Sequence, residues 1–189
     1  MKKIAVIYHS GYGHTKKMAE HIALGAASVK DTEVSCVELK DGNEAIESLS
    51  DYDGMILGTP TYMGSASAVM KRFMENSSAF FADRAWKNKV AGGFTLSHSL
   101  SGDKLNTLNQ LMIFAMQHGM IWVGFESLNA SPDNQPGKAD VVNRMGGFLG
   151  AMGQTENDSA EVTPPSGDLK TAWIYGERIA TITHALKME

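Results

Sequence analysis

Two hydrophobic periodicities alternate along the chain and predict alternating strands and helices. Continuous apolar runs are typical of parallel strands that are buried on both faces. These runs are residues 4–8, 54–58, 90–95 and 120–124. Residues 33–39 alternate instead, which predicts a strand nearer the edge of the sheet. Apolar residues at helical spacing predict helices between the strands. These helices cover residues 15–27, 66–74, 103–117 and 168–187.

Strands that alternate with helices imply right-handed crossovers and a parallel sheet with helices on both faces. Five strands fit a three-layer, doubly wound α/β fold with strand order 2-1-3-4-5. The chain shows no internal repeat and no linker, so we expect one domain over residues 1–189. The final helix has Asp168 as a plausible cap, and the helix at 103–117 is expected to bury Leu105, Leu108, Leu111, Met112 and Ala115.

One connection is unusually long. Residues 126–167 are rich in Gly, Pro, Asn and Ser, and connections of this length are uncommon in compact domains. Residues 145–150 within it are apolar enough to pack on another surface. The segment is therefore interpreted as a lid or a subunit contact, with simple mobility as the alternative.

The loop after the first strand has the features of an anion site. In an open parallel sheet, ligands bind beyond the carboxyl ends of the strands, where the strand order reverses. Here Ser10-Gly11-Tyr12-Gly13-His14-Thr15 leads directly into a helix. Two hydroxyl groups and the N–H groups of a helix start favour a phosphate there, without a cation. The alternative is a plain turn with Thr15 as a helix cap.

Other phosphate-binding motifs fit this loop poorly. No Gly-Lys-Ser/Thr follows it, which excludes a nucleoside triphosphate loop. Lys16 stands where the dinucleotide fingerprint needs its third glycine, although Glu38 ends the second strand where a ribose-binding acid would lie.

The loops after the third and fourth strands are also unusual. Gly58-Thr59-Pro60-Thr61-Tyr62-Met63-Gly64 combines a rigid proline, flexible glycines and an aromatic ring that could stack on a flat ligand. The segment at 95–103 places four hydroxyl groups around one histidine, which suits the polar edge of a heterocycle. Ordinary connecting loops are the alternative in both places.

Composition and charge narrow the class of protein. The 189 residues carry a net charge of −4, and this mild acidity gives no electrostatic footprint for nucleic acid. Cys36 is the only cysteine, so no intramolecular disulfide forms, and we expect an inert, buried thiol. The histidines lack metal-ligand spacing, so no metal site is predicted. No apolar stretch approaches the roughly 20 residues that span a bilayer, and a cytoplasmic protein without membrane insertion is expected.

Together these loops resemble the flavodoxin-like family of FMN proteins. The likeness is greatest to the NAD(P)H:quinone oxidoreductase branch of the tryptophan-repressor-binding-protein (WrbA) type, which is also related to the NADPH-dependent FMN reductases. It covers residues 3–124 and the last helix. Its most specific motifs are Ser10-x-Tyr12-Gly13-His14-Thr15, Gly58-Thr59-Pro60-Thr61-Tyr62-Met63-Gly64 and His118-Gly119-Met120-Ile121-x-Val123-Gly124.

The resemblance implies a binding role for each loop. The FMN phosphate would be held by Ser10, Tyr12, Gly13, His14 and Thr15. One side of the isoalloxazine would be lined by Pro60, Thr61, Tyr62, Met63 and Gly64. The ring or the ribityl chain would be bordered by Thr95, Ser97, Ser99, Gly102 and Asp103. His118 would approach the pyrimidine end of the flavin, in the same subunit or from a neighbouring one; the alternative is a structural histidine at a helix end.

Two departures from that branch lie near the expected nicotinamide or quinone position. Tyr62-Met63 stands where the branch usually has Arg-Phe, and Ser101-Gly102-Asp103 replaces its usual His-Gly-Gly. The resemblance thus supports FMN more firmly than it supports NAD(P)H or a quinone.

The function expected from these observations is an FMN oxidoreductase of the quinone reductase type. NADPH or NADH would donate electrons, a small molecule such as a quinone would accept them, and Tyr62 and His118 are the candidate residues beside the ring. One alternative is an electron carrier to protein partners, and another is a regulatory protein that uses FMN to fix its fold. A homodimer or homotetramer is implied by the resemblance. Phe80, Phe81 and Trp86 are either exposed anchors for that assembly or a cap on the core.

Overall fold

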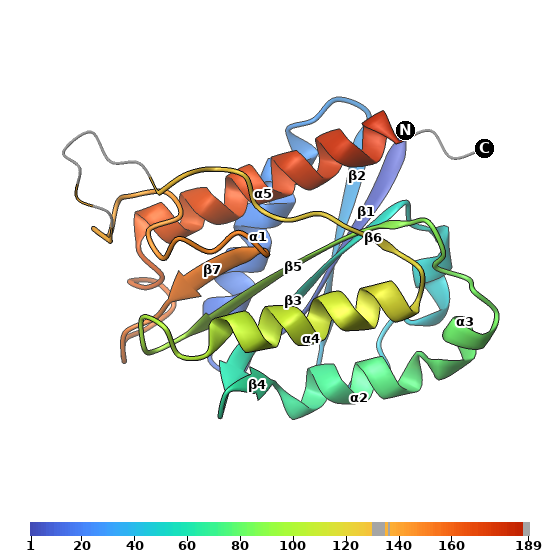
Figure 1. The fold of residues 1–189 in the computed structure, drawn as a ribbon, viewed down its shortest axis with the longest axis horizontal. Coiled ribbons are helices and arrows are strands. Elements are labelled where there is room, and N and C mark those ends of the chain that lie inside the picture. Colours follow the sequence, from blue (N-terminus) through green and yellow to red (C-terminus); the bar gives the residue numbers. More distant parts are fainter. Residues whose placement is uncertain (130–134, 136, 187–189) are drawn as a thin grey trace.

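The fold was examined in a computed structural model that describes residues 1–129, 135 and 137–186. Strands β1 (Lys2–His9), β2 (Thr32–Leu39), β3 (Gly54–Tyr62), β5 (Val90–Ser97) and β6 (Ile121–Trp122) form a parallel sheet in the order β2-β1-β3-β5-β6 (Figure 1). This is the expected 2-1-3-4-5 order. The expected edge position of the second strand is also confirmed.

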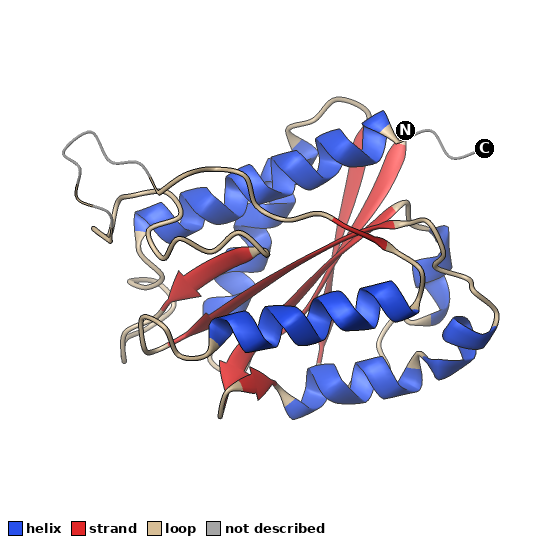
Figure 2. Ribbon diagram, in the orientation of Figure 1, coloured by secondary structure: helices blue, strands red, loops and turns tan. Residues whose placement is uncertain are grey.

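Helices cover both faces of the sheet (Figure 2). One face is covered by α1 (His14–Ala27) and α5 (Ser166–Ala185), and the other by α2 (Ala68–Asn76) and α4 (Lys104–Gln117). The shorter elements are the 3₁₀ helix η1 (Glu47–Asp51), strand β4 (Ser65–Ala66), helix α3 (Ser78–Ala82) and strand β7 (Ala151–Gln154). Residue 187 of the expected final helix lies outside the described residues.

The fifth strand is split, which differs from the continuous strand expected over residues 120–124. β6 pairs only with Val90 and Ala91 of β5, and β7 takes over beside the stretch from Phe94 to Ser97. The chain leaves the sheet after Phe125, and the Phe125 N–H donates to the carbonyl of Phe148 as the chain returns. The long connection therefore contributes residues 151–154 to the sheet before it reaches α5.

Two hydrophobic cores lie on the two faces of the sheet. The core under α1 and α5 includes Met18, Ile22 and Tyr175, and the core under α2 and α4 includes Phe73 and Trp86. The helix at the 103–117 position buries Leu108, Leu111 and Ala115 as expected. Leu105 is instead 55% exposed, so its inclusion in the buried stripe is wrong. Phe114, three positions after Leu111, completes that stripe.

Helices α1 and α5 pack unusually close together because each helix has a glycine that lies against the backbone of the other helix. A Cβ on Gly176 would overlap the carbonyl oxygen of Ile22, and one on Gly25 would overlap the carbonyl oxygen of Trp173. Any larger side chain at either position forces the helices apart.

Two further expectations are corrected, and one open alternative is decided. Asp168 is not a helix cap, since it lies inside the first turn of α5 and its carboxylate binds Arg144 at 2.8 Å. Cys36 is exposed on the edge strand, because only one face of β2 is covered. Trp86 is fully buried and Phe80 packs against it, so this aromatic pair caps a core; Phe81 is 46% exposed.

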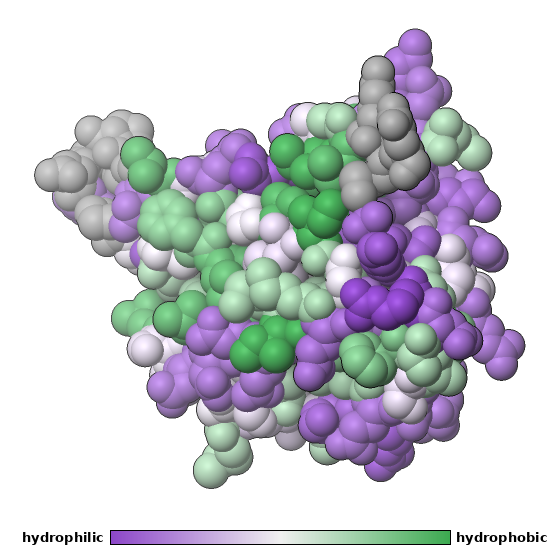
Figure 3. All heavy atoms as spheres, turned by 45° about the vertical axis from the view of Figure 1, so that its right-hand side comes forward, coloured by the Kyte–Doolittle hydropathy of each residue, from purple (hydrophilic) through white to green (hydrophobic). Residues whose placement is uncertain are grey.

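On the face drawn in Figure 3, hydrophobic side chains gather at the left and centre of the view, and hydrophilic ones cover most of its right side and lower edge. The exposed positions of α4 are Leu105, Asn106, Ile113, Met116 and Gln117, none of which is charged. Among the described residues, no helix is long and apolar enough to cross a membrane.

Candidate functional site

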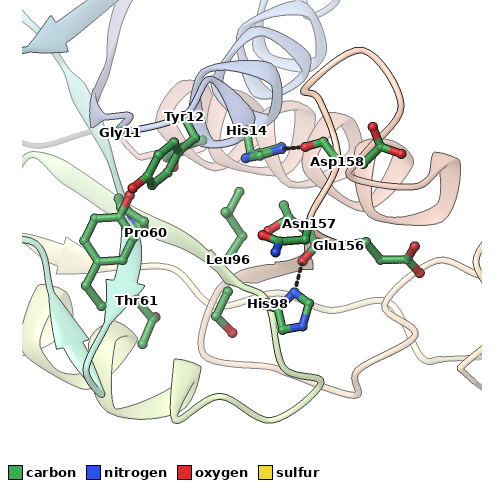
Figure 4. Close-up of a pocket in the computed structure, with 14 residues that line it drawn as sticks. Gly11, Tyr12, His14, Pro60, Thr61, Leu96, His98, Glu156, Asn157 and Asp158 are labelled. Atoms are coloured by element: carbon green, nitrogen blue, oxygen red, sulfur yellow. Dashed lines mark hydrogen bonds between the residues drawn. The ribbon is translucent and has the colours of Figure 1, made fainter.

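A cavity of about 510 Å³ lies beyond the carboxyl ends of β1, β3 and β5 (Figure 4). Its volume is in the range of small-molecule and cofactor sites. All three loops selected from the sequence contribute to it, and residues 155–158 of the long connection form the remaining wall. The cavity lies where the strand order reverses between β1 and β3, as the doubly wound fold requires.

The first loop presents unpaired backbone N–H groups to the cavity. Helix α1 begins at His14 after Gly13, which has a φ of 91° and provides no side-chain cap. The Oγ of Ser10 accepts hydrogen bonds from the N–H groups of Gly13 at 3.1 Å and Lys16 at 3.2 Å. Within the described part of the chain, the N–H groups of Tyr12, His14 and Thr15 have no acceptor. A helix start of this kind suits an anion.

The second loop is a tight hairpin between β3 and β4. Thr61 pairs with Ala66 and Tyr62 with Ser65, so Met63 and Gly64 form a two-residue turn with φ values of 48° and 79°. Two positive φ values are typical of the hairpin turn that matches the twist of the strands. Met63 is left fully exposed at the tip.

Tyr62 extends from this hairpin towards the first loop. Its hydroxyl lies against Gly11, where a Cβ would overlap it. Tyr62 is 40% exposed, and burial together with the neighbouring Tyr12 raises the pKa of its hydroxyl. Tyr12, which is mainly exposed, and Tyr62 therefore lie on the same side of the cavity.

The third loop supplies Leu96, Ser97 and His98 to the cavity. The Nδ1 of His98 is 3.2 Å from the carbonyl oxygen of Thr155, which joins this loop to the wall at 155–158. Across the cavity, the Nε2 of His14 is 2.8 Å from the carbonyl oxygen of Asp158 (Figure 4). Two histidines thus tie the long connection to the site.

Beneath the third loop lies a buried lysine. Lys104 is 1% exposed, and its Nζ donates to the Oγ of Ser97 at 2.9 Å and to the carbonyl of Ser99 at 2.7 Å. Burial lowers the pKa of its amine, the charge of Asp168 opposes this shift and that of Arg144 adds to it, and the resulting pKa is about 8.

Thr95 and Thr61 hold the framework below the cavity. Thr95 is fully buried, and its Oγ1 donates to the carbonyl of Thr59 at 2.6 Å. The Oγ1 of Thr61 lies 2.8 Å from that of Thr95 and 2.8 Å from that of Thr107. Thr61 still lines the cavity, whereas Thr95 does not.

Several expected site residues lie elsewhere. Asp103 faces a second cleft, between α4 and residues 144–149, and Gly102 packs against Ser97. Ser99 contributes its carbonyl to Lys104 rather than to the cavity wall. Met63 borders a shallow surface hollow beside Tyr12 and Tyr62.

His118 lies near the amino ends of the strands, on the side opposite the cavity, because α4 runs antiparallel to the strands. It is 2% exposed, stacks on Trp86 with ring centroids 4.3 Å apart, and its Nε2 is 3.0 Å from the Oγ of Ser77. Within this chain it therefore fits the structural alternative, and it is not part of the cavity.

The site also includes residues outside the set assigned to FMN. His98 is the histidine already noted in the 95–103 segment, and Leu96 lies between the assigned residues Thr95 and Ser97 on β5. Residues 155–158 (Thr-Glu-Asn-Asp) read as an ordinary polar loop and carry no local signal of their position. Gln154 brings them there, because its Nε2 donates to the carbonyl of His98 at 3.0 Å.

The fold and the position of the cavity are those of a flavodoxin-like protein. The sequence model of the NADPH-dependent FMN reductases matches residues 3–135. The chain belongs to this family of FMN-binding flavodoxin-like oxidoreductases, which supports FMN as cofactor and a nicotinamide as electron donor.

Relatives of nearly the same length carry two kinds of name. The chain is 40% identical to Flavodoxin FldP of Pseudomonas aeruginosa, covering 98% of this chain and 99% of the relative. It is 28% identical to an NAD(P)H dehydrogenase (quinone) of Archaeoglobus fulgidus, covering 98% and 100%. A crystal structure of a flavodoxin, WrbA-like protein from Agrobacterium tumefaciens matches with a TM-score of 0.75 and 36% identity, covering 99% and 100%.

Proposed function

We propose that this protein binds FMN in the cavity, accepts electrons from NADPH or NADH, and transfers them to a small acceptor such as a quinone. The observation that carries the proposal is the convergence of the three switch-point loops on one cavity at the start of α1, in a chain of the NADPH-dependent FMN reductase family. When bound, FMN supplies the electron-transfer chemistry, and the protein supplies binding and orientation.

The phosphate fits the first loop. The unpaired N–H groups belong to Tyr12, His14 and Thr15, which lie at the start of α1 and line the cavity. The hydroxyl of Thr15 is a further hydrogen-bond donor there. Gly13 adopts the positive φ that this turn needs. No lysine or arginine of the described residues lines the cavity, so backbone dipoles and hydroxyl groups are the expected source of phosphate binding.

The flat ring fits between the second and third loops. Pro60, Thr61 and Tyr62 provide one wall, and Leu96, Ser97 and His98 provide another. Met63 lies at the rim next to Tyr62, and Gly102 packs against Ser97 of the third loop. Tyr62 is the candidate residue to contact the ring, and its partly exposed side chain leaves room for a substrate to approach.

Anaerobic stopped-flow absorbance of the FMN-loaded protein tests this function. Rapid bleaching of the flavin band by NADPH or NADH, reversed by benzoquinone, is the expected result. Failure of both nucleotides to bleach the band, although dithionite does so, would exclude the reductase. Failure to take up FMN would contradict the site itself.

The second candidate function is electron transfer to a protein partner without a small-molecule substrate. It is favoured by the 40% identity to a protein named a flavodoxin. The two candidates differ in their response to nicotinamide, since a pure carrier needs a separate reductase protein. The stopped-flow experiment therefore separates them directly.

We also expect self-association through the uncharged outer face of α4. Charged residues are depleted in interface cores, and Leu105, Ile113 and Met116 are exposed there without a charged neighbour on the helix surface. Ile113→Asp should lower the mass measured by light scattering, with Leu24→Asp, another exposed apolar residue, as the control. An unchanged mass for the Ile113 variant would place any interface elsewhere.

A further inference from the structure

The start of α4 contains an arrangement that is costly for stability. Lys104 is a buried amine in the first turn of a helix, where the helix dipole opposes a positive charge. Buried charges in proteins are normally paired, yet none of the ion pairs between described residues includes Lys104. The hydrogen bonds that its amine makes to described residues go to Ser97 and Ser99, both of which are uncharged. A local rule broken in this way points to a functional demand.

The position of Lys104 relates this cost to the cavity. The Oγ of Ser97 receives the Lys104 ammonium at 2.9 Å, and Ser97 lines the cavity where the flavin ring is proposed to lie. The acidic residues that line the wall itself are Glu156 and Asp158. Among the described residues, Lys104 is the cation that donates directly to a side chain of the wall.

We propose that Lys104, acting through Ser97, is the positioning residue that compensates the negative charge which FMN gains on reduction. This inference rests on the proposed function, because it needs FMN in the cavity. Bound FMN would supply the redox chemistry: a hydride from the nicotinamide carries two electrons and one proton, so its transfer would leave the neutral ring with one added negative charge and the nicotinamide as a cation. A fixed ammonium behind the wall would stabilise that charge. The Ser97 Oγ accepts from this ammonium at 2.9 Å and donates to the Ser99 carbonyl at 3.1 Å, which holds the side chain in place.

The surroundings of Lys104 give the effect a distinct pH dependence. Asp168 of α5 stabilises the ammonium, whereas Arg144 of the long connection and burial oppose it, so its pKa is about 8. New negative charge in the cavity raises that pKa again. Above pH 8, reduction should therefore draw an extra proton onto Lys104, whereas at pH 7 the amine is already charged.

Spectroelectrochemical titration of the FMN-loaded protein between pH 7 and pH 10 tests the proposal. The expected result for the natural protein is a larger proton uptake per two electrons at pH 9 than at pH 7. Lys104→Met should abolish the increase and reduce the preference for reduced over oxidised FMN by about tenfold at pH 7. Lys104→Arg should abolish the increase but keep the preference, because an arginine stays charged.

The matched control is Lys71→Met, which removes an exposed lysine on α2 and changes the net charge equally. It should behave as the natural protein does. Constant proton uptake in the natural protein across this pH range overturns the proposal, even if every Lys104 variant fails to fold. The proposal is also overturned if Lys104→Met binds and reduces FMN with the same proton uptake and the same preference for reduced FMN as the natural protein. That result would leave the proposed function standing. Absence of FMN binding contradicts the proposed function instead.

Discussion

The backbone N–H of Gly93 donates a hydrogen bond to the hydroxyl of Tyr175 at 3.0 Å. That hydroxyl in turn donates to the carbonyl of Val123 at 2.6 Å. The bridge lies where β6 has ended and β7 has not yet begun, so a side chain from α5 replaces the missing pairing of backbone to backbone. A Cβ on Gly92 would lie 2.6 Å from the hydroxyl, so glycine is required there. The break in the fifth strand is thus built into the core.

Tyr175→Phe should lower the free energy of unfolding by about 1–3 kcal/mol, because it leaves the Gly93 N–H and the Val123 carbonyl buried without a partner. Urea denaturation measures the change. Tyr12→Phe, at a residue that is 81% exposed, is the control and should have little effect. Equal stability of the two variants would show that the bridge contributes nothing.

Gly176→Ala should destabilise the protein by about 2 kcal/mol or more, because the added Cβ overlaps the carbonyl oxygen of Ile22 and α1 must move away from α5. Thermal unfolding measures the loss, with Thr181→Ala at an exposed position of α5 as the control. Because α1 also carries the proposed phosphate site at its start, weaker FMN binding should accompany the loss. A variant as stable as the natural protein would mean that the helices tolerate a wider spacing.

The periodicity of the sequence was sufficient to predict the sheet order and both layers of helices. The reason is that burial on one face or on two faces sets the hydrophobic pattern of each strand and helix locally. The split of the fifth strand was not predictable in this way. Pairing with β5 depends on Tyr175, some fifty residues beyond Val123, and no local pattern records that contact. Likewise Leu105 was placed in the apolar stripe of α4 by spacing, but in that turn the buried positions are Lys104, Thr107 and Leu108, so Leu105 points away from the core.

The candidate site shows the same division. Thr15, Tyr62 and Ser97 could be selected because they follow strands whose carboxyl ends meet at one edge. Within this chain His118 lies at the opposite end of the strands from the cavity, because its motif follows α4 and that helix runs antiparallel to the strands. Asp158 reaches the cavity only through the folding of the long connection.

Stability should fall in acid because of His118. Burial and the nearby charge of Arg84 lower the pKa of its imidazole to about 4, whereas the unfolded chain has the ordinary value of 6.5. The unfolded state therefore binds the proton more readily, and this contribution to stability is present above pH 6.5 and is lost as the pH falls towards 4. The loss amounts to about 3 kcal/mol. In His118→Phe, the urea midpoint should change less between pH 6.5 and 4 than in the natural protein. If the two proteins show the same dependence of the midpoint on pH, His118 is not the cause of the acid loss.

Arg144→Met should destabilise the protein by about 3–5 kcal/mol, because the buried carboxylate of Asp168 loses its cation. Arg144 also donates to the side chain of Gln154 at 2.9 Å, which holds the carbonyl of His98, so the wall of the cavity should loosen and FMN should bind more weakly. Arg72→Met, on the exposed face of α2, is the control. Denaturation and FMN titration measure the two effects, and loss of stability without weaker FMN binding would separate the ion pair from the site.

Ser10→Ala tests the proposed phosphate loop most directly. Its Oγ accepts the N–H groups of Gly13 and Lys16, which fixes the turn so that the N–H groups of Tyr12, His14 and Thr15 stay free for the phosphate. Without that oxygen the turn loses two hydrogen bonds, and FMN affinity should fall by about tenfold, corresponding to about 1.4 kcal/mol. Fluorescence quenching of FMN measures the affinity. Riboflavin, which lacks the phosphate, should bind to both forms equally, whereas an equal loss for riboflavin would place the phosphate away from this loop. Ser28→Ala, at the other end of α1, is the matched control, because its hydroxyl caps only the carbonyl of Gly25.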